Sequence, residues 1–183
     1  VEQQMAIVSR TMLAGFINSD FNIINQLETE KRLEQAGKLL PPSKEQLGVI
    51  RSLSAFIQNP NIKAEENNQF SSWIYLKGPA GTGKTQIVLP WALKSANISV
   101  SNVISLGHND MTSKGIAKAL GTTYHTKEAL LKMIDSGNLT PNIEVIVIDE
   151  AAGFDRVDLT AIAEAIQKAN LQRKDSPIKV ISL

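Results

Sequence analysis

The chain has 183 residues, of which 43% are hydrophobic and 20% charged, and its formal net charge is +1. This composition is ordinary for a globular protein, and the length is sufficient for one domain with a hydrophobic core and a further segment. The chain contains no cysteine, which excludes disulfides, thiolate zinc sites and cysteine nucleophiles and fits a cytoplasmic or other reducing compartment. No apolar run approaches the roughly 18 residues of a membrane span, so we expect no membrane partner.

Residues 1–39 are predicted to form a helical arm or linker that precedes every motif. Helical patterns fill 1–37, with a break at Asn18-Ser19-Asp20 where Asp20 would cap a second helix. The sequence starts at Val1 with neither a methionine nor a signal-peptide pattern. We therefore expect the chain to be part of a longer protein, and a viral or phage origin is possible. Residues 1–37 could contact a partner protein.

The next helix is predicted from its first turn. Pro41-Pro42 interrupts the chain, and Ser43-Lys44-Glu45-Gln46 has the spacing of a capping box, in which the first and fourth side chains each bond the other's backbone N–H. We expect this helix to run to about Gln58, because Asn59-Pro60 follows it. A polar loop is expected at 60–72.

Residues 78–85 carry the most specific pattern of the chain. They read Gly78-Pro79-Ala80-Gly81-Thr82-Gly83-Lys84-Thr85, which fits G-x-x-x-x-G-K-[ST], the phosphate-binding P-loop. The glycines let backbone N–H groups turn toward one anion, Lys84 adds a positive charge for the β- and γ-phosphates, and Thr85 offers a hydroxyl to Mg²⁺. A predicted strand at 73–77 and a predicted helix at 85–96 give the required order of elements, although Pro90 should kink that helix or leave an early carbonyl unpaired.

Strands and helices alternate downstream of the P-loop. The expected elements are strands at 102–106, 144–148 and 178–183 and helices at 113–120, 126–136 and 156–170. Gly121 and Gly137 fit the ends of two of these helices. The series predicts an α/β fold with a parallel sheet flanked by helices, preceded by the N-terminal helical segment.

Two carboxylates end the strand expected at 144–148. Its aliphatic run is typical of a strand buried on both faces, and the carboxyl end of such a strand is where ligands bind in open α/β sheets. Asp149 is predicted to hold Mg²⁺, and Glu150 to orient and polarise the water that attacks the γ-phosphate. Together with the P-loop, these residues predict an ATPase that binds ATP and Mg²⁺, with Lys84 and Glu150 as its catalytic residues.

These motifs resemble those of superfamily 1 helicases, particularly the RecD-like branch. The P-loop is similar to motif I, Leu40 with Ser43-Lys44-Glu45-Gln46 is similar to the Q motif, and Ile148-Asp149-Glu150-Ala151-Ala152 is similar to motif II. The resemblance covers residues 40–183 and implies the first RecA-like ATPase domain of an ATP-dependent helicase. It also implies that Gln46 recognises adenine, whereas the capping pattern alone makes Gln46 a helix-cap partner.

The same resemblance implies a single-strand track. Thr123-Tyr124-His125-Thr126 is similar to the T-x-H-[ST] segment that lies along the strand in the RecD-like branch, and residues 105–114 occupy the place of motif Ia without its usual threonine pattern. The implied contacts to single-stranded DNA or RNA are Asn109, Thr112, Lys114, His125 and Thr126. Residues 71–143 hold seven Lys or Arg against three acidic residues, which suits phosphate contacts but is also compatible with solvated helix faces.

The resemblance also implies a partner domain. In such helicases a second RecA-like domain follows the strand that corresponds to 178–183, and it supplies arginine fingers and the other half of the track. Three alternatives stay open: a single-domain P-loop ATPase of the PhoH type, an oligomeric AAA+ ATPase, and a nucleotide-binding scaffold module of a larger assembly.

Overall fold

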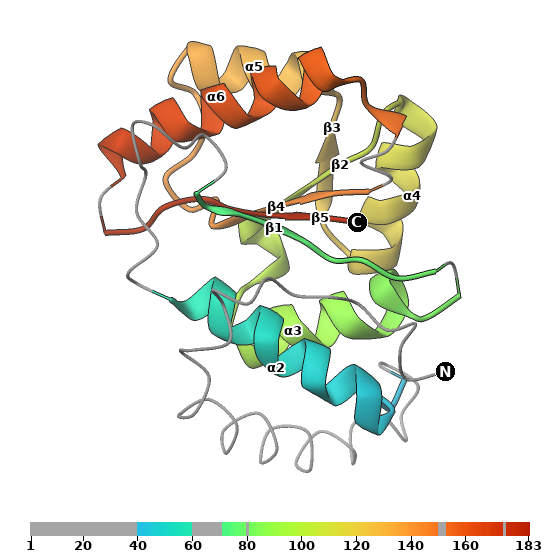
Figure 1. Ribbon diagram of the computed structural model, residues 1–183. Helices are drawn as coiled ribbons and strands as arrows, with labels where there is room; N and C mark the ends of the chain where they lie inside the picture. Colours follow the sequence, from blue (N-terminus) through green and yellow to red (C-terminus); the bar gives the residue numbers. More distant parts are fainter. Residues whose placement is uncertain (1–39, 60–70, 80, 150–152, 174) are drawn as a thin grey trace. The chain divides into compact units, whose positions relative to one another are not determined.

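The computed structural model in Figure 1 describes residues 40–59, 71–79, 81–149, 153–173 and 175–183. The predicted arm at 1–39, most of the loop expected at 60–72, and Ala80 and Glu150 lie outside the described residues. The rest forms two compact units. One contains the described residues of 40–59 and 75–99, and the other contains those of 71–74 and 100–183.

The first unit begins with helix α2, Lys44–Gln58. The capping box predicted from the sequence is confirmed, because Ser43 Oγ accepts from the Gln46 N–H at 3.2 Å and Gln46 Oε1 accepts from the Ser43 N–H at 2.8 Å. Asn59 caps the other end. The buried face of α2 packs against helix α3, Leu89–Ser95, whose Trp91 is also buried and donates its indole N–H to the Leu40 carbonyl at 2.7 Å.

The helix predicted at 85–96 is two segments in the structure. Lys84–Val88 forms a π-helical turn, η3, and α3 begins only at Leu89. Pro90 therefore stands in the first turn of α3, where a missing N–H and a fixed φ are tolerated. The sequence predicted one helix kinked at Pro90, whereas the structure has the π-helical turn η3 before Pro90 and a new helix that starts at Leu89.

The second unit carries a five-stranded sheet in the order β1-β5-β4-β2-β3 (Figure 1). Its strands are β1 Trp73–Tyr75, whose last residue belongs to the first unit, β2 Val103–Leu106, β3 Thr123–His125, β4 Val145–Ile148 and β5 Lys179–Ser182. The pairs β2–β3, β2–β4 and β4–β5 are parallel. Four strands were predicted within one or two residues, whereas β3 was not, because a short edge strand with exposed residues lacks a buried aliphatic run.

Three helices of the second unit complete the α/β fold predicted from the sequence. They are α4 Asp110–Leu120, α5 Lys127–Asp135 and α6 Arg156–Gln172, with a short 3-10 turn, η4, at Val100–Asn102 before β2. Gly121 and Gly137 follow α4 and α5 with φ of 70° and 69°, as helix-ending glycines should. Helix α4 begins three residues earlier than predicted, because Asn109 caps it.

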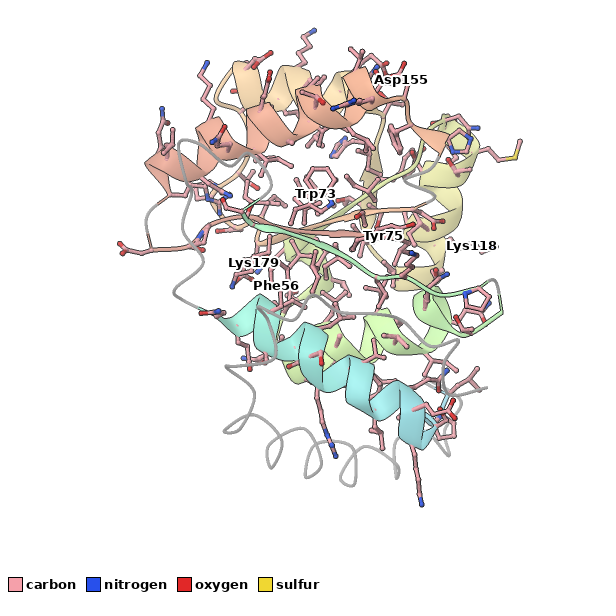
Figure 2. All side chains as sticks on the ribbon, in the orientation of Figure 1. Phe56, Trp73, Tyr75, Lys118, Asp155 and Lys179 are labelled. Atoms are coloured by element: carbon pink, nitrogen blue, oxygen red, sulfur yellow. The ribbon has the colours of Figure 1, made fainter. Side chains whose placement is uncertain are left out.

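Both faces of the central strands are buried, as the aliphatic runs predicted. On one face, residues of β2, β4 and β5 form a core cluster with Leu130 of α5 and with Ile162 and Ile166 of α6, the two helices that lie together in Figure 1. Trp73 packs against this cluster and donates its indole N–H to Ser182 Oγ at 2.8 Å (Figure 2). Helix α4 packs against β2 and β3. Within the described residues, every helix is too short or too polar to cross a membrane.

Lys179, the first residue of β5, is a buried charge, with only 7% of its surface exposed. Burial lowers the pKa of its ammonium group to about 8, and the nearby Glu144 carboxylate opposes that shift. Burial thus removes part of the hydration of the Lys179 ammonium group and destabilises its charged form.

Replacing Lys179 by Met should stabilise the fold near neutral pH, because the variant buries no charge. In the wild type, an unfolded Lys179 titrates near 10.5 and the folded one at about 8. Between these values the unfolded state binds more protons, so wild-type stability should rise with pH across this window. Urea unfolding at about pH 7 and about pH 10 should show that rise in the wild type and in an exposed control, Lys168→Met, but not in Lys179→Met. The same rise in Lys179→Met would contradict this assignment.

Candidate nucleotide-binding site

The P-loop has the backbone that its glycines predicted. Gly81 and Gly83 adopt φ of +80° and +78°, the left-handed region that glycine enters without a Cβ clash. A Cβ on Gly83 would lie 2.7 Å from Gln46 Nε2, which is too close for a real contact. Gly83 is therefore required by its φ, and a side chain at this position would also displace the Gln46 amide.

Lys84 folds back over the loop that precedes it. Its Nζ donates to the Gly78 carbonyl, and the Pro79 carbonyl lies 3.4 Å away. Thr82 Oγ1 also donates to the Pro79 carbonyl, at 2.9 Å. The ammonium group thus lies at the start of a glycine loop whose carbonyl oxygens accept from it. Phosphate oxygens of a nucleotide would take the place of those acceptors, so this donor set fits a polyphosphate.

Thr85 follows in the first turn of the helical segment. The N–H groups of Ile87 and Val88 both donate to the Gly83 carbonyl at 2.9 Å, so the loop runs directly into helical backbone. The first N–H groups of a helix have no partner within it and, with the helix dipole, favour an anion. Thr85 therefore stands where a hydroxyl can serve a cation bound to the phosphates.

Gln46 links helix α2 to the P-loop. Its Oε1 accepts from the Ser43 N–H, as described for the capping box, and its Nε2 donates to the Thr82 carbonyl at 2.9 Å. The Gln46 side chain thus caps the start of α2 and also bonds the phosphate loop, 36 residues further along the sequence. The sequence did not predict this contact, and adenine recognition by Gln46 stays a prediction.

Asp149 belongs to the second unit and follows β4 directly, with its backbone N–H donating to the Leu106 carbonyl at 2.8 Å. The predicted base Glu150 lies outside the described residues. Within the part of the chain that the structure describes, no three His, Cys, Asp or Glu residues gather as metal ligands. The role of Asp149 as an Mg²⁺ ligand stays a prediction.

The five residues predicted to contact nucleic acid lie around the carboxyl ends of β2 and β3, and three of them cap helices. Asn109 and Thr112 form a reciprocal cap at the start of α4, and Thr126 accepts from the Ala129 N–H at the start of α5. Residues 110–112, which precede the helix expected at 113–120, therefore belong to the first turn of α4. Lys114 forms an exposed ion pair with Asp110 at 2.7 Å, and His125 ends β3 beside Leu106.

Gly107 is a position that sequence reasoning missed. It links β2 to the start of α4, and a Cβ there would collide with Thr112 Oγ1 and lie 2.5 Å from the Ser113 N–H nitrogen. Its own N–H donates to Ser113 Oγ at 2.9 Å. A lone glycine after a predicted strand gave no signal, because the close approach depends on the unexpected early start of α4.

A glycine phosphate loop between the first strand and a helix of a parallel α/β fold defines a P-loop NTPase. A family model described as an AAA domain matches residues 66–173, which is more than half of the chain. The chain therefore belongs to the AAA domain family of P-loop ATPases. Membership implies nucleotide binding, typically with Mg²⁺, and ATP hydrolysis. No curated protein matches the chain closely enough to be reported.

Gly83→Ala should lose nucleotide binding and stability together. The left-handed backbone costs an alanine about 1–2 kcal/mol, and its Cβ displaces the Gln46 amide from the Thr82 carbonyl. Gly48→Ala is the matched control, because Gly48 lies within α2 with nothing within 4 Å of the added Cβ. That variant should gain about 0.5–1 kcal/mol and bind normally. Urea unfolding and titration with a fluorescent ATP analogue measure both effects, and equal behaviour of the two variants would refute this account of the loop.

Proposed function

We propose that this chain is the first motor domain of an ATP-dependent nucleic-acid helicase or translocase. It binds Mg-ATP on residues 78–85 and forms half of a track for single-stranded DNA or RNA. The other half, and an arginine finger, would come from a second RecA-like domain of a parent protein. ATP binding would close the two domains on each other, and hydrolysis would reopen them, so that the strand is gripped and released in steps.

The observation that carries the nucleic-acid part of this proposal is a pair of neighbouring helix starts. Strands β2 and β3 are parallel, with Leu106 beside His125, so their carboxyl ends lie together. Each leads into a capped helix N-terminus, at Asn109 for α4 and at Thr126 for α5. Two helix N-termini side by side favour anions and provide N–H donors. With the Lys114 ammonium nearby in α4, they suit successive phosphates of a backbone.

The chemistry proposed for the nucleotide follows from the residue types. Lys84 holds the β- and γ-phosphates, Thr85 and Asp149 serve Mg²⁺, and Gln46 prefers adenine. Glu150 orients a water that attacks the γ-phosphorus, and it accepts that water's proton as the bond to the β–γ bridging oxygen breaks. In the described part of the chain, Arg51 lies in α2 and Arg156 starts α6, while Arg173 donates to the Pro141 and Ile143 carbonyls. None of these follows a phosphate loop, which supports an arginine finger from elsewhere.

A single-domain or self-assembling ATPase is the second candidate. The observation that favours it is the family match itself, because an AAA domain is an ATPase module whether or not a nucleic acid is its substrate. Residues 1–37, which lie outside the described part of the chain, would then be a docking segment for another protein. The two candidates differ in whether a single strand binds and in whether this chain turns over ATP unaided.

Lys84→Ala should weaken binding of a fluorescent ATP analogue about tenfold or more, because a charge-assisted hydrogen bond to phosphate contributes about 1.5–3 kcal/mol. The thermal unfolding midpoint should change little, since within the described residues the ammonium group of Lys84 donates to loop carbonyls. Lys94→Ala removes an exposed lysine from the end of α3 and is the matched control. Normal nucleotide affinity in Lys84→Ala would refute the role assigned to this residue.

Steady-state ATPase of the chain, with and without a single-stranded oligonucleotide, separates the two candidates. We expect slow turnover and little stimulation, because a missing arginine finger typically costs about 10³–10⁵ in rate. The oligonucleotide should nevertheless bind at low salt. Fast, strand-stimulated hydrolysis by the chain alone would favour the self-sufficient ATPase, and no oligonucleotide binding at low salt would contradict the helicase.

Glu150→Gln in the parent protein should keep ATP affinity and lose turnover.

A further inference from the structure

Pro90 stands where an α-helix that begins at Lys84 would need a backbone N–H. In regular α-helical bonding, the N–H of residue 90 donates to the carbonyl of residue 86, four residues earlier. Proline has no N–H, and its ring clashes with the carbonyl four residues before it. A single α-helix through Lys84 and Pro90 would therefore leave the Gln86 carbonyl without its N–H partner and press the proline ring against it.

The turn η3 avoids this conflict by bonding over five residues instead of four. The Val88 N–H donates to the Gly83 carbonyl at 2.9 Å, and the Leu89 N–H donates to the Lys84 carbonyl. Each of these bonds closes a π-helical turn, which holds one more residue than an α-helical turn. The π-helical turn ends at Val88 and α3 starts at Leu89, so residues 86 and 90 do not belong to one α-helical turn.

The wider turn gives the Gly83 carbonyl two hydrogen-bond donors. It accepts from the Ile87 N–H as well as from the Val88 N–H, both at 2.9 Å. The peptide bond between Gly83 and Lys84 is planar and trans, so its N–H points away from its carbonyl oxygen. Two bonds on the carbonyl therefore also fix the direction of the Lys84 N–H. Lys84 begins η3, and the first N–H groups of a helical segment have no partner within it.

We propose that Pro90 is a positioning residue of the nucleotide site and acts through η3 on the backbone donors for the phosphates. This inference rests on the part of the proposed function that puts Mg-ATP on residues 78–85. Because residue 90 offers no N–H, the turn keeps its five-residue bonds, and these hold the peptide groups on both sides of Lys84. The N–H groups of Lys84 and Thr85 are then oriented before the nucleotide arrives, which lowers the cost of ordering them on binding.

Pro90→Ala tests this role, because alanine supplies the N–H without adding a large side chain. We expect the turn to become α-helical, with the Val88 N–H donating to the Lys84 carbonyl instead of the Gly83 carbonyl. Scalar couplings across the hydrogen bonds, measured by NMR on the isotope-labelled full chain, identify the acceptor of each N–H. Pro90→Ser also supplies an N–H and should give the same change. Pro141→Ala replaces an exposed proline before β4 and should leave the turn as it is in the wild type.

Nucleotide affinity and stability should then change differently. Titration with a fluorescent ATP analogue should show about tenfold weaker binding in Pro90→Ala and Pro90→Ser, the loss expected when about one donor to phosphate is poorly oriented. Urea unfolding should show that Pro90→Ala is at least as stable as the wild type, because alanine is a better helix former than proline. Pro141→Ala should bind the analogue normally. A proline that served only the fold would lower both quantities or neither.

Three results would overturn the positioning role. Unchanged hydrogen bonds in Pro90→Ala would show that the proline does not set the bonding of the turn. Changed hydrogen bonds with wild-type affinity would show that the turn does not act on the nucleotide. Weaker binding together with lower stability would indicate a packing role. Failure of the wild type to bind the analogue would instead contradict the proposed nucleotide site, so the two failures are distinguishable.

Discussion

The conformation of the phosphate loop depends on the absence of a side chain at Gly83. Its φ of +78° turns the chain into the helical segment, and the space that a Cβ would fill is taken by Gln46 Nε2. Because that amide donates to the Thr82 carbonyl and also completes the cap of α2, three features depend on one another. They are the start of α2, the shape of the loop, and the π-helical turn that lets Pro90 stand at the start of α3.

The second unit depends on a different constraint, the complete burial of its central strands. Parallel pairing of β2 with both β3 and β4 brings their carboxyl ends to one edge, so every segment that leaves this edge must satisfy its polar groups locally. The caps at Asn109 and Thr126 do this for two helices. The same edge carries Asp149. The caps place hydroxyl and amide side chains at this edge, and the proposed phosphate track rests on these groups.

The amino-acid pattern predicted the parts of the fold whose signals are local. The bounds of α2 follow from the capping box and from Asn59, and β4 follows from four consecutive aliphatic residues. Two of the parts it missed depend on partners that are distant in the sequence. Strand β3 is three residues long and pairs with β2. The early start of α4 is a different case, because the cap between Asn109 and Thr112 is local and was overlooked. The contact between Gln46 and Thr82 joins residues that no short motif relates. For the site, the P-loop residues were identified from the motif alone, whereas the side chains that support them needed the structure.

Backbone amide NMR with a non-hydrolysable Mg-ATP analogue tests the central claim, that this loop and no other part of the chain holds the phosphates. Gly81, Gly83, Gly121 and Gly137 all have positive φ, but only the first two lie in the P-loop. We expect large shifts of the Gly81, Gly83, Lys84 and Thr85 amides on titration, and unchanged Gly121 and Gly137 amides, since those glycines end helices. Saturable binding with shifts at the helix-ending glycines and none in residues 81–85 would contradict it.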